Sequence, residues 1–127
     1  MRRALLDRLV VWKNNPRRKP LILNGARQVG KTWLLKEFGR LHFENVAYVS
    51  LDSDVLAQSY FDSGFDIARI IASLSLELGM DIRPGSTLIV LDEVQAAPKA
   101  ITSLKYFCED APEYAVVAAG SLLGISA

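Results

Sequence analysis

The apolar positions of the chain form two patterns: short continuous runs, and runs in which an apolar residue returns every three or four positions. Continuous runs of this length are typical of strands that a parallel sheet buries on both faces. They predict strands at residues 21–23, 46–51, 87–91 and 114–119. The second pattern predicts helices at residues 3–13, 33–38 and 67–78, and a fourth between residues 98 and 111. Because strands and helices alternate, we expect an α/β fold with a parallel sheet between two layers of helices.

Glycine and proline set the expected ends of these helices. Gly39 and Gly79 follow the last apolar residues of the second and third helices and are predicted to stop them. Pro98 is predicted to open the fourth helix, because proline at the first helical position loses no hydrogen bond, and Pro112 prevents its continuation. The inner face of this helix is expected to consist of Ile101, Leu104 and Cys108.

The size and charge of the chain are those of one ordinary globular domain. It has 127 residues, and we treat residues 1–127 as one domain, with an N-terminal helix and a core that begins near residue 20. Its 15 basic and 14 acidic side chains give a net charge of +1. This balance argues against a disordered polyelectrolyte and decides nothing about nucleic acid.

Cysteine content and hydropathy favour a cytoplasmic protein. Cys108 is the only cysteine, so the chain has no internal disulfide, which fits a reducing compartment. Asp7 and Arg8 interrupt the apolar residues after the basic N-terminus, so no signal-peptide core is formed. The most apolar stretch, residues 114–127, is shorter than the roughly 20 residues that cross a bilayer. We therefore expect no membrane span.

The first predicted strand and the helix after it are joined by a glycine-rich loop. Its spacing is G-x-x-x-x-G-K-T, in Gly25, Ala26, Arg27, Gln28, Val29, Gly30, Lys31 and Thr32. The glycines allow the backbone to curl so that its N–H groups and the start of the helix point at a di- or triphosphate. Lys31 would reach the terminal phosphates, and the Thr32 hydroxyl would bind Mg²⁺. The loop therefore predicts ATP and magnesium as ligands.

Trp33 follows this loop directly and belongs to the predicted nucleotide-binding segment. Its ring could stack on adenine, as could that of Trp12, although apolar packing is the favoured use of each.

Two carboxylates follow the third predicted strand. Asp92 and Glu93 come directly after the buried run at residues 87–91, so they emerge at the carboxyl edge of the sheet, where open α/β folds bind ligands. Asp92 would hold Mg²⁺ through its waters, and Glu93 would orient and deprotonate an attacking water.

Three functions are compatible with these residues. ATP hydrolysis is favoured, because a glutamate beside the metal-binding aspartate suits the activation of water. The alternative from a different class is a nucleotide-dependent switch or interaction module with negligible turnover. The third is phosphoryl transfer to a small acceptor, which would need an acceptor pocket.

Other polar residues are given structural interpretations. The basic residues 17–19 are interpreted as an exposed run, His42 as a partly exposed residue at a helix end, and Asp52 and Asp54 as caps of a following helix.

Three segments resemble AAA+ ATPases: the loop from Gly25 to Thr32, the segment from Leu88 to Gln95, and the sequence Ala118-Ala119-Gly120-Ser121. The resemblance runs from Met1 to the end of the chain. It is closest to a prokaryotic group in which this core is followed by a C-terminal domain of unsettled function.

This resemblance implies a P-loop core truncated before its last strand and its helical lid. It places the strand at 114–119 between the strands at 21–23 and 87–91, and it gives Ser121 the sensor position that contacts the γ-phosphate or water. It also implies a homo-oligomer, an arginine beyond Ala127 that completes a neighbour's site, and a protein or DNA client. Arg27 is not assigned that arginine's role.

Overall fold

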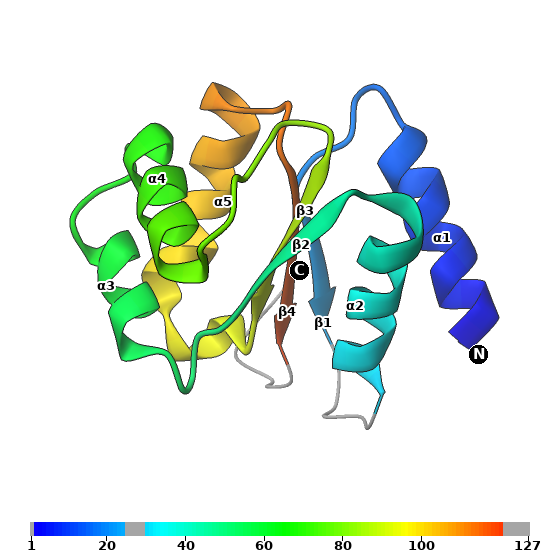
Figure 1. Ribbon diagram of the computed structural model, residues 1–127, viewed down its shortest axis with the longest axis horizontal. Helices are drawn as coiled ribbons and strands as arrows, with labels where there is room; N and C mark the ends of the chain where they lie inside the picture. The colour runs from blue at the N-terminus through cyan, green and yellow to red at the C-terminus, as the bar shows by residue number, and fades with distance from the viewer. Residues whose placement is uncertain (1, 25–29, 121–127) are drawn as a thin grey trace.

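The computed structural model describes residues 2–24 and 30–120, and its centre is a sheet of four parallel strands (Figure 1). The strands are β1 (Leu21–Asn24), β2 (Asn45–Ser50), β3 (Thr87–Asp92) and β4 (Ala115–Gly120). The helices are α1 (Arg2–Asn14), α2 (Lys31–His42), α3 (Val55–Asp62), α4 (Ile67–Leu78), the 3-10 turn η1 (Val94–Ala96) and α5 (Pro98–Asp110). The predicted α/β class is confirmed, and each predicted strand is present to within a residue or two.

The sheet has the strand order β1-β4-β3-β2. Strand β4 therefore lies between the strand that precedes the glycine-rich loop and the strand that carries Asp92, as the family resemblance implied. All strands are parallel, so the carboxyl ends of β1, β4, β3 and β2 meet at one edge of the sheet. Residues that are far apart in the sequence are brought together there.

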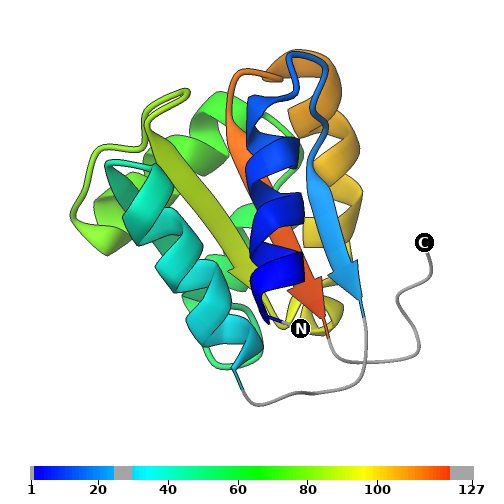
Figure 2. The ribbon, with the colours of Figure 1, turned by 90° about the vertical axis from the view of Figure 1, so that its right-hand side faces the viewer.

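Two helical layers cover the sheet, with α1 and α2 on one face and α3, α4 and α5 on the other (Figures 1 and 2). Side chains alternate along each strand between these layers. In β3, Leu88 and Val90 pack with residues of α1 and α2, whereas Ile89 and Leu91 pack with residues of α3, α4 and α5. The same alternation puts Asp92 on the face that α2 covers.

Gly39 has a different function from the predicted one. Helix α2 does not stop there but continues to His42, and Gly39 is buried in its interior. A Cβ atom at this position would overlap Cγ2 of Val46 and would lie 3.2 Å from Cδ2 of Leu88. The glycine therefore allows the helix backbone to approach the sheet closely, and the helix pays the small loss of propensity that glycine causes.

The other predicted helix ends agree better with the structure. Gly79 caps α4 with a φ of 66°, and Pro98 occupies the first turn of α5. The inner face of α5 was predicted only in part, because Leu104 is buried whereas Ile101 and Cys108 are half-buried. The remaining buried residues of this helix are Ala100, Ser103 and Phe107. Hydrophobicity does not predict the burial of Ser103, whose hydroxyl donates to the carbonyl of Ala100 in the same helix at 2.6 Å.

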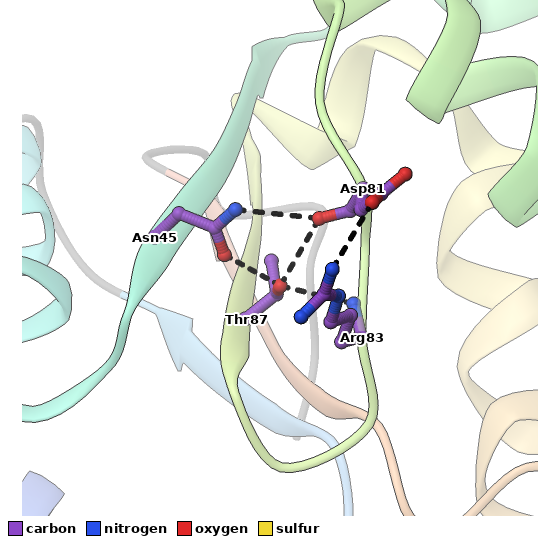
Figure 3. A network of polar contacts seen from close by, with 4 residues as sticks. All are labelled: Asn45, Asp81, Arg83 and Thr87. Carbon is purple, nitrogen blue, oxygen red and sulfur yellow. Dashed lines mark hydrogen bonds and ion pairs between the residues drawn. The ribbon is translucent and has the colours of Figure 1, made fainter.

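A polar network fixes the register at the amino ends of β2 and β3 (Figure 3). The hydroxyl of the fully buried Thr87 donates to the side-chain carbonyl of Asn45 and accepts from the backbone N–H of Arg83 at 3.0 Å. Asn45 in turn donates to the carbonyl of Asp81. This pairing of Asn45 with Thr87 sets Ser50 opposite Asp92 at the other end of the two strands.

No helix in the described part of the chain is both long and apolar enough to span a bilayer.

Candidate functional site

The carboxyl edge of the sheet carries the residues that the sequence singled out. Gly30 is the N-cap residue of α2 and has a φ of 102°, a conformation that glycine adopts without strain. Lys31, the first residue of the helix, donates from Nζ to the carbonyl of Gly120 at 3.0 Å, at the end of β4. Residues 25–29 of the predicted loop and Ser121 lie outside the described residues. The lysine therefore connects the start of α2 to the tip of the central strand.

Asp92 is the meeting point of three elements. Its Oδ2 accepts a hydrogen bond from the Thr32 hydroxyl on α2 at 2.7 Å and another from the Tyr48 hydroxyl on β2 at 2.6 Å. Its Oδ1 accepts from the backbone N–H of Glu93 at 2.9 Å. The carboxylate is 4% exposed. The loop and the acidic strand predicted from the sequence are thus joined through one buried carboxylate.

The environment of Asp92 suits a hard cation. Its three donors are neutral, and within residues 2–24 and 30–120 no lysine, arginine or histidine forms an ion pair with it. A buried carboxylate without a cation is costly unless a partner neutralises it. The Thr32 hydroxyl can donate its proton to Asp92 and still offer a lone pair to a metal. Oxygen ligands of this kind, few in number and completed by phosphate and water, are those that Mg²⁺ uses.

Tyr48 is held as a neutral donor. Burial, and secondly its hydrogen bond to Asp92, raise the pKa of its hydroxyl above the ordinary value of 10.0. The ammonium of Lys36, one turn along α2 from Thr32, lies 4.1 Å from the centroid of the tyrosine ring. The ring is therefore contacted from the helix while its hydroxyl points at the carboxylate.

Glu93 lies in a left-handed turn directly after the strand. It has a φ of 50° and a ψ of 47°, the only positive φ of a non-glycine residue in the described ranges. Such a conformation costs a non-glycine residue about 1–2 kcal/mol. Its Oε1 accepts a hydrogen bond from the side-chain amide of Gln95 at 2.7 Å. Strain of this kind concentrates at functional sites, where the surrounding structure maintains it.

Comparisons with known proteins identify the family and the fold of the chain. Residues 17–127 match the family described as AAA domain. The chain belongs to this family. Its P-loop ATPase fold is also found in the structure of PCH-2 from C. elegans, with a TM-score of 0.60 and 12% sequence identity. That similarity covers 99% of this chain and 38% of PCH-2, so the chain spans well under half of the length of that protein. No curated protein matches the sequence.

The tryptophans of the AAA domain differ in their surroundings. Trp12 packs at the edge of the core beneath α1 and α2 and donates from Nε1 to the carbonyl of Lys19 at 2.7 Å, as its packing interpretation predicts. Trp33 is 54% exposed, so any apolar packing of its ring lies outside the buried core. Its neighbours Leu34 and Leu35 are buried instead, because they are the residues that α2 turns toward the sheet.

The predicted structural uses are confirmed for His42 and Asp54 but not for Arg18 and Asp52. Arg18 donates to the carbonyls of Lys13 and Glu113, both at 3.1 Å, so this member of the basic run is occupied within the fold. His42 is exposed at the end of α2. Asp54 caps α3 by accepting from the backbone N–H of Ala57 at 2.9 Å, whereas Asp52 accepts from the Ser50 hydroxyl at 2.7 Å and caps no helix.

Two polar residues of the site were not predicted. Tyr48 lies within a predicted strand, and its contact with Asp92 depends on the register of β2 against β3. Gln95 lies in the segment that carries the family resemblance. Its side chain reaches Glu93 because Glu93 has a left-handed backbone conformation, which the spacing of the two residues does not indicate. The one sequence signal for Tyr48 was alternation, which puts its hydroxyl on the same face of the strand as the residue at the carboxyl end of that strand.

Proposed function

We propose that this AAA domain binds ATP with Mg²⁺ at the carboxyl edge of its sheet and hydrolyses the terminal phosphate. The observation that carries the proposal is the 2.7 Å hydrogen bond between Thr32 and Asp92. It joins the residue that would bind the metal from the glycine-rich loop to the residue that would bind it from the acidic strand. The domain proposed for this function comprises residues 1–127.

Nucleotide binding falls to the loop and to the start of α2. The backbone of Gly25, Ala26, Arg27, Gln28, Val29 and Gly30 would surround the phosphates, and the positive end of the α2 dipole would face them. The Lys31 ammonium would exchange the Gly120 carbonyl for the β- and γ-phosphates, a stronger acceptor because it is charged. Trp33, which is 54% exposed and follows Thr32, would contact the base.

Hydrolysis requires an activated water on the far side of the γ-phosphate. Mg²⁺, when bound, neutralises charge on the phosphate oxygens. The Thr32 hydroxyl would bind the ion, and Asp92 would hold it through its bound waters. Glu93 would accept a proton from the attacking water as the bond from that water to phosphorus forms and the bond to the β,γ-bridging oxygen breaks. Ser121, which follows Gly120 in the sequence, would hydrogen bond to the γ-phosphate or to that water.

The proposed coupling is to a region outside this chain. Lys31 and Thr32 begin α2, whereas Asp92 ends β3 and Glu93 follows it, so a change of nucleotide would move the ends of two elements together. We propose that this movement is passed to a C-terminal region and, in a homo-oligomer, to a neighbour whose arginine completes the site. An arginine of that kind contributes about three to five orders of magnitude to rate in related chemistry.

Two substitutions test the assignment of binding and hydrolysis to separate residues. Glu93→Gln is expected to retain ATP affinity and to lower turnover by on the order of 100-fold or more, because general base catalysis is lost while shape is kept. Lys31→Ala is expected to weaken ATP binding itself. Both are measured on the intact protein by equilibrium binding and by phosphate release. Turnover of the Glu93 variant at the wild-type rate would refute the role of Glu93.

The alternative function, a nucleotide-dependent switch with negligible turnover, is favoured by one observation. The carboxylate of Glu93 is already engaged by Gln95, which restrains it from acting on water. Mg²⁺-dependent ATP binding by the intact protein without phosphate release would favour this alternative.

A further inference from the structure

Two hydroxyl groups converge on a single oxygen of the proposed metal-binding carboxylate. Thr32 on α2 and Tyr48 on β2 donate to the same Oδ2 of Asp92, at 2.7 and 2.6 Å. Thr32 belongs to the glycine-rich loop and is accounted for by the proposed function. Tyr48 has no part in that function as described above, and its hydroxyl is nonetheless at the centre of the site.

The hydrogen bonds of Asp92 leave it little freedom. An ionised carboxylate has about four lone-pair positions, and three are occupied, two on Oδ2 and one on Oδ1. Because Thr32 and Tyr48 approach Oδ2 from different elements, rotation of the carboxylate about its terminal bond would break at least one of these bonds. The plane of the carboxylate is therefore set jointly by the helix and by the neighbouring strand.

Tyr48 is itself firmly placed. It lies two residues before Ser50, which pairs with Asp92. Because side chains alternate along a strand, the side chains of Tyr48 and Ser50 both lie on the face of the sheet that α2 covers. Its ring packs at the edge of the core that α1 and α2 cover, and the Lys36 ammonium lies 4.1 Å from the ring centroid. A tyrosine hydroxyl is protonated near neutral pH, and so able to donate. A fixed, neutral donor is suited to orient an anion without competing with a cation for its charge.

We propose that Tyr48 is a positioning residue for magnesium. It acts through Asp92, by holding that carboxylate in the orientation in which it and the Thr32 hydroxyl bind one ion. Hydrogen-bond partners of metal-binding carboxylates typically contribute 10- to 100-fold in metal affinity. The inference rests on the proposed function, since it assigns Asp92 to magnesium. It adds a residue of β2 to that function, a strand that carries neither the glycine-rich loop nor Asp92 and Glu93.

The test compares nucleotide binding with and without metal in Tyr48→Phe. This substitution removes one hydroxyl and keeps the ring that packs under α2. Binding of a fluorescent ADP derivative is titrated in the intact protein, first in EDTA and then at increasing MgCl₂. We expect the Mg²⁺ concentration for half-maximal enhancement of binding to rise about tenfold, and the affinity in EDTA to stay at the wild-type value. The affinity in EDTA also reports that the variant is folded.

Two further variants separate positioning from packing. Tyr106→Phe removes a hydroxyl from a ring of α5 that stacks on Phe65, with 4.8 Å between centroids, on the other face of the sheet, and is expected to leave the Mg²⁺ requirement unchanged. In an Asp92→Asn background, Tyr48→Phe is expected to add nothing, because its effect passes through the carboxylate.

Three results would overturn the inference: an unchanged Mg²⁺ requirement in Tyr48→Phe, an equal loss of affinity with and without metal, or a full additional loss in the Asp92→Asn background. If the wild-type protein itself shows no Mg²⁺-dependent binding, the proposed function fails as well. The first three results leave that function standing, so the two failures are distinguishable.

Discussion

The carboxylate of Glu93 accepts a hydrogen bond from the side-chain amide of Gln95, only two residues further along the chain. The contact is possible because Glu93 is left-handed and the 3-10 turn from Val94 to Ala96 folds back toward it. One oxygen of the proposed base is therefore fixed by its own turn.

This contact predicts that Gln95→Ala lowers the rate of ATP hydrolysis. Small displacements of a catalytic group are costly in rate, so we expect kcat to fall by roughly tenfold. The KM for ATP should be unchanged, because the hydrogen bond that Gln95 donates goes to Glu93, which is assigned to hydrolysis and not to ATP binding. Steady-state phosphate release measures both constants, with the exposed Lys99→Ala on the next helix as control. A rise in kcat would instead mean that Gln95 holds Glu93 in a resting position.

The close approach of α2 to the sheet predicts that Gly39→Ala is destabilising. The added methyl group would overlap Val46 and crowd Leu88, and overpacking of this kind costs about 1–3 kcal/mol. Denaturant unfolding gives the free energy of unfolding for this variant and for the double variant with Val46→Ala. The double variant should lose less than the sum of the two single losses, because Val46→Ala removes the clashing atom. Additive losses would show that the helix moves away instead.

The contacts of Arg18 predict a loss of stability without a loss of nucleotide binding. Arg18→Ala removes two hydrogen bonds to backbone carbonyls and the guanidinium that lies 5.9 Å from the centroid of the Trp12 ring. We expect the free energy of unfolding to fall by about 1–2 kcal/mol. Arg17→Ala, at an exposed position, should change it little. Weaker ATP binding by a fully stable Arg18 variant would contradict the structural interpretation of the basic run.

Glu77 on α4 predicts a pH-dependent contribution to stability. The neighbouring carboxyl of Asp54, followed by burial, raises its pKa above the ordinary value of 4.5, and a hydrogen bond from Tyr60 opposes the rise. Its Oε1 is buried and has no hydrogen-bond partner in the described structure. The folded protein thus binds this proton more readily than the unfolded chain does. The stability contributed by Glu77 is therefore present at low pH and is lost as the pH rises through the folded pKa.

Glu77→Gln, which mimics the protonated form, should accordingly raise the melting temperature at pH 7. This advantage should shrink as the pH falls toward 4.5. Thermal unfolding at several pH values between 4.5 and 7 measures the difference, and the exposed Glu109→Gln serves as control. A difference that stays constant with pH would show that Glu77 does not titrate in this range.

The sequence predicted those parts of the fold that depend on local pattern. Continuous apolar runs gave the strands, because a parallel sheet buries both of their faces. Asp92 was placed at the sheet edge from the run before it, and the structure puts it beside Thr32. The functional assignments of Thr32 and Asp92 stay predictions, as do those of Ser121 and of the loop that begins at Gly25.

The parts that depend on long-range contact were not predictable. The sequence alone indicates a helix stop at Gly39. The steric clash that requires a glycine there involves Val46, and the sequence does not give the distance between that strand and the helix. Tyr48 contacts Asp92 only because β2 pairs with β3 in one particular register. The short helix α3 was not predicted, although the Asp54 cap and the helical spacing of Ala57, Tyr60 and Phe61 were local signals for it.

The different surroundings of the two tryptophans have a practical consequence. Trp12 is shielded at the edge of the core, whereas Trp33 faces solvent beside Thr32. Indole emission depends on the polarity around the ring, so a base that displaces water from Trp33 changes the fluorescence of the protein while Trp12 contributes a steady background. Under the proposed function, Trp33 would be an optical reporter of nucleotide occupancy, and Trp12→Phe would isolate its signal for label-free kinetics.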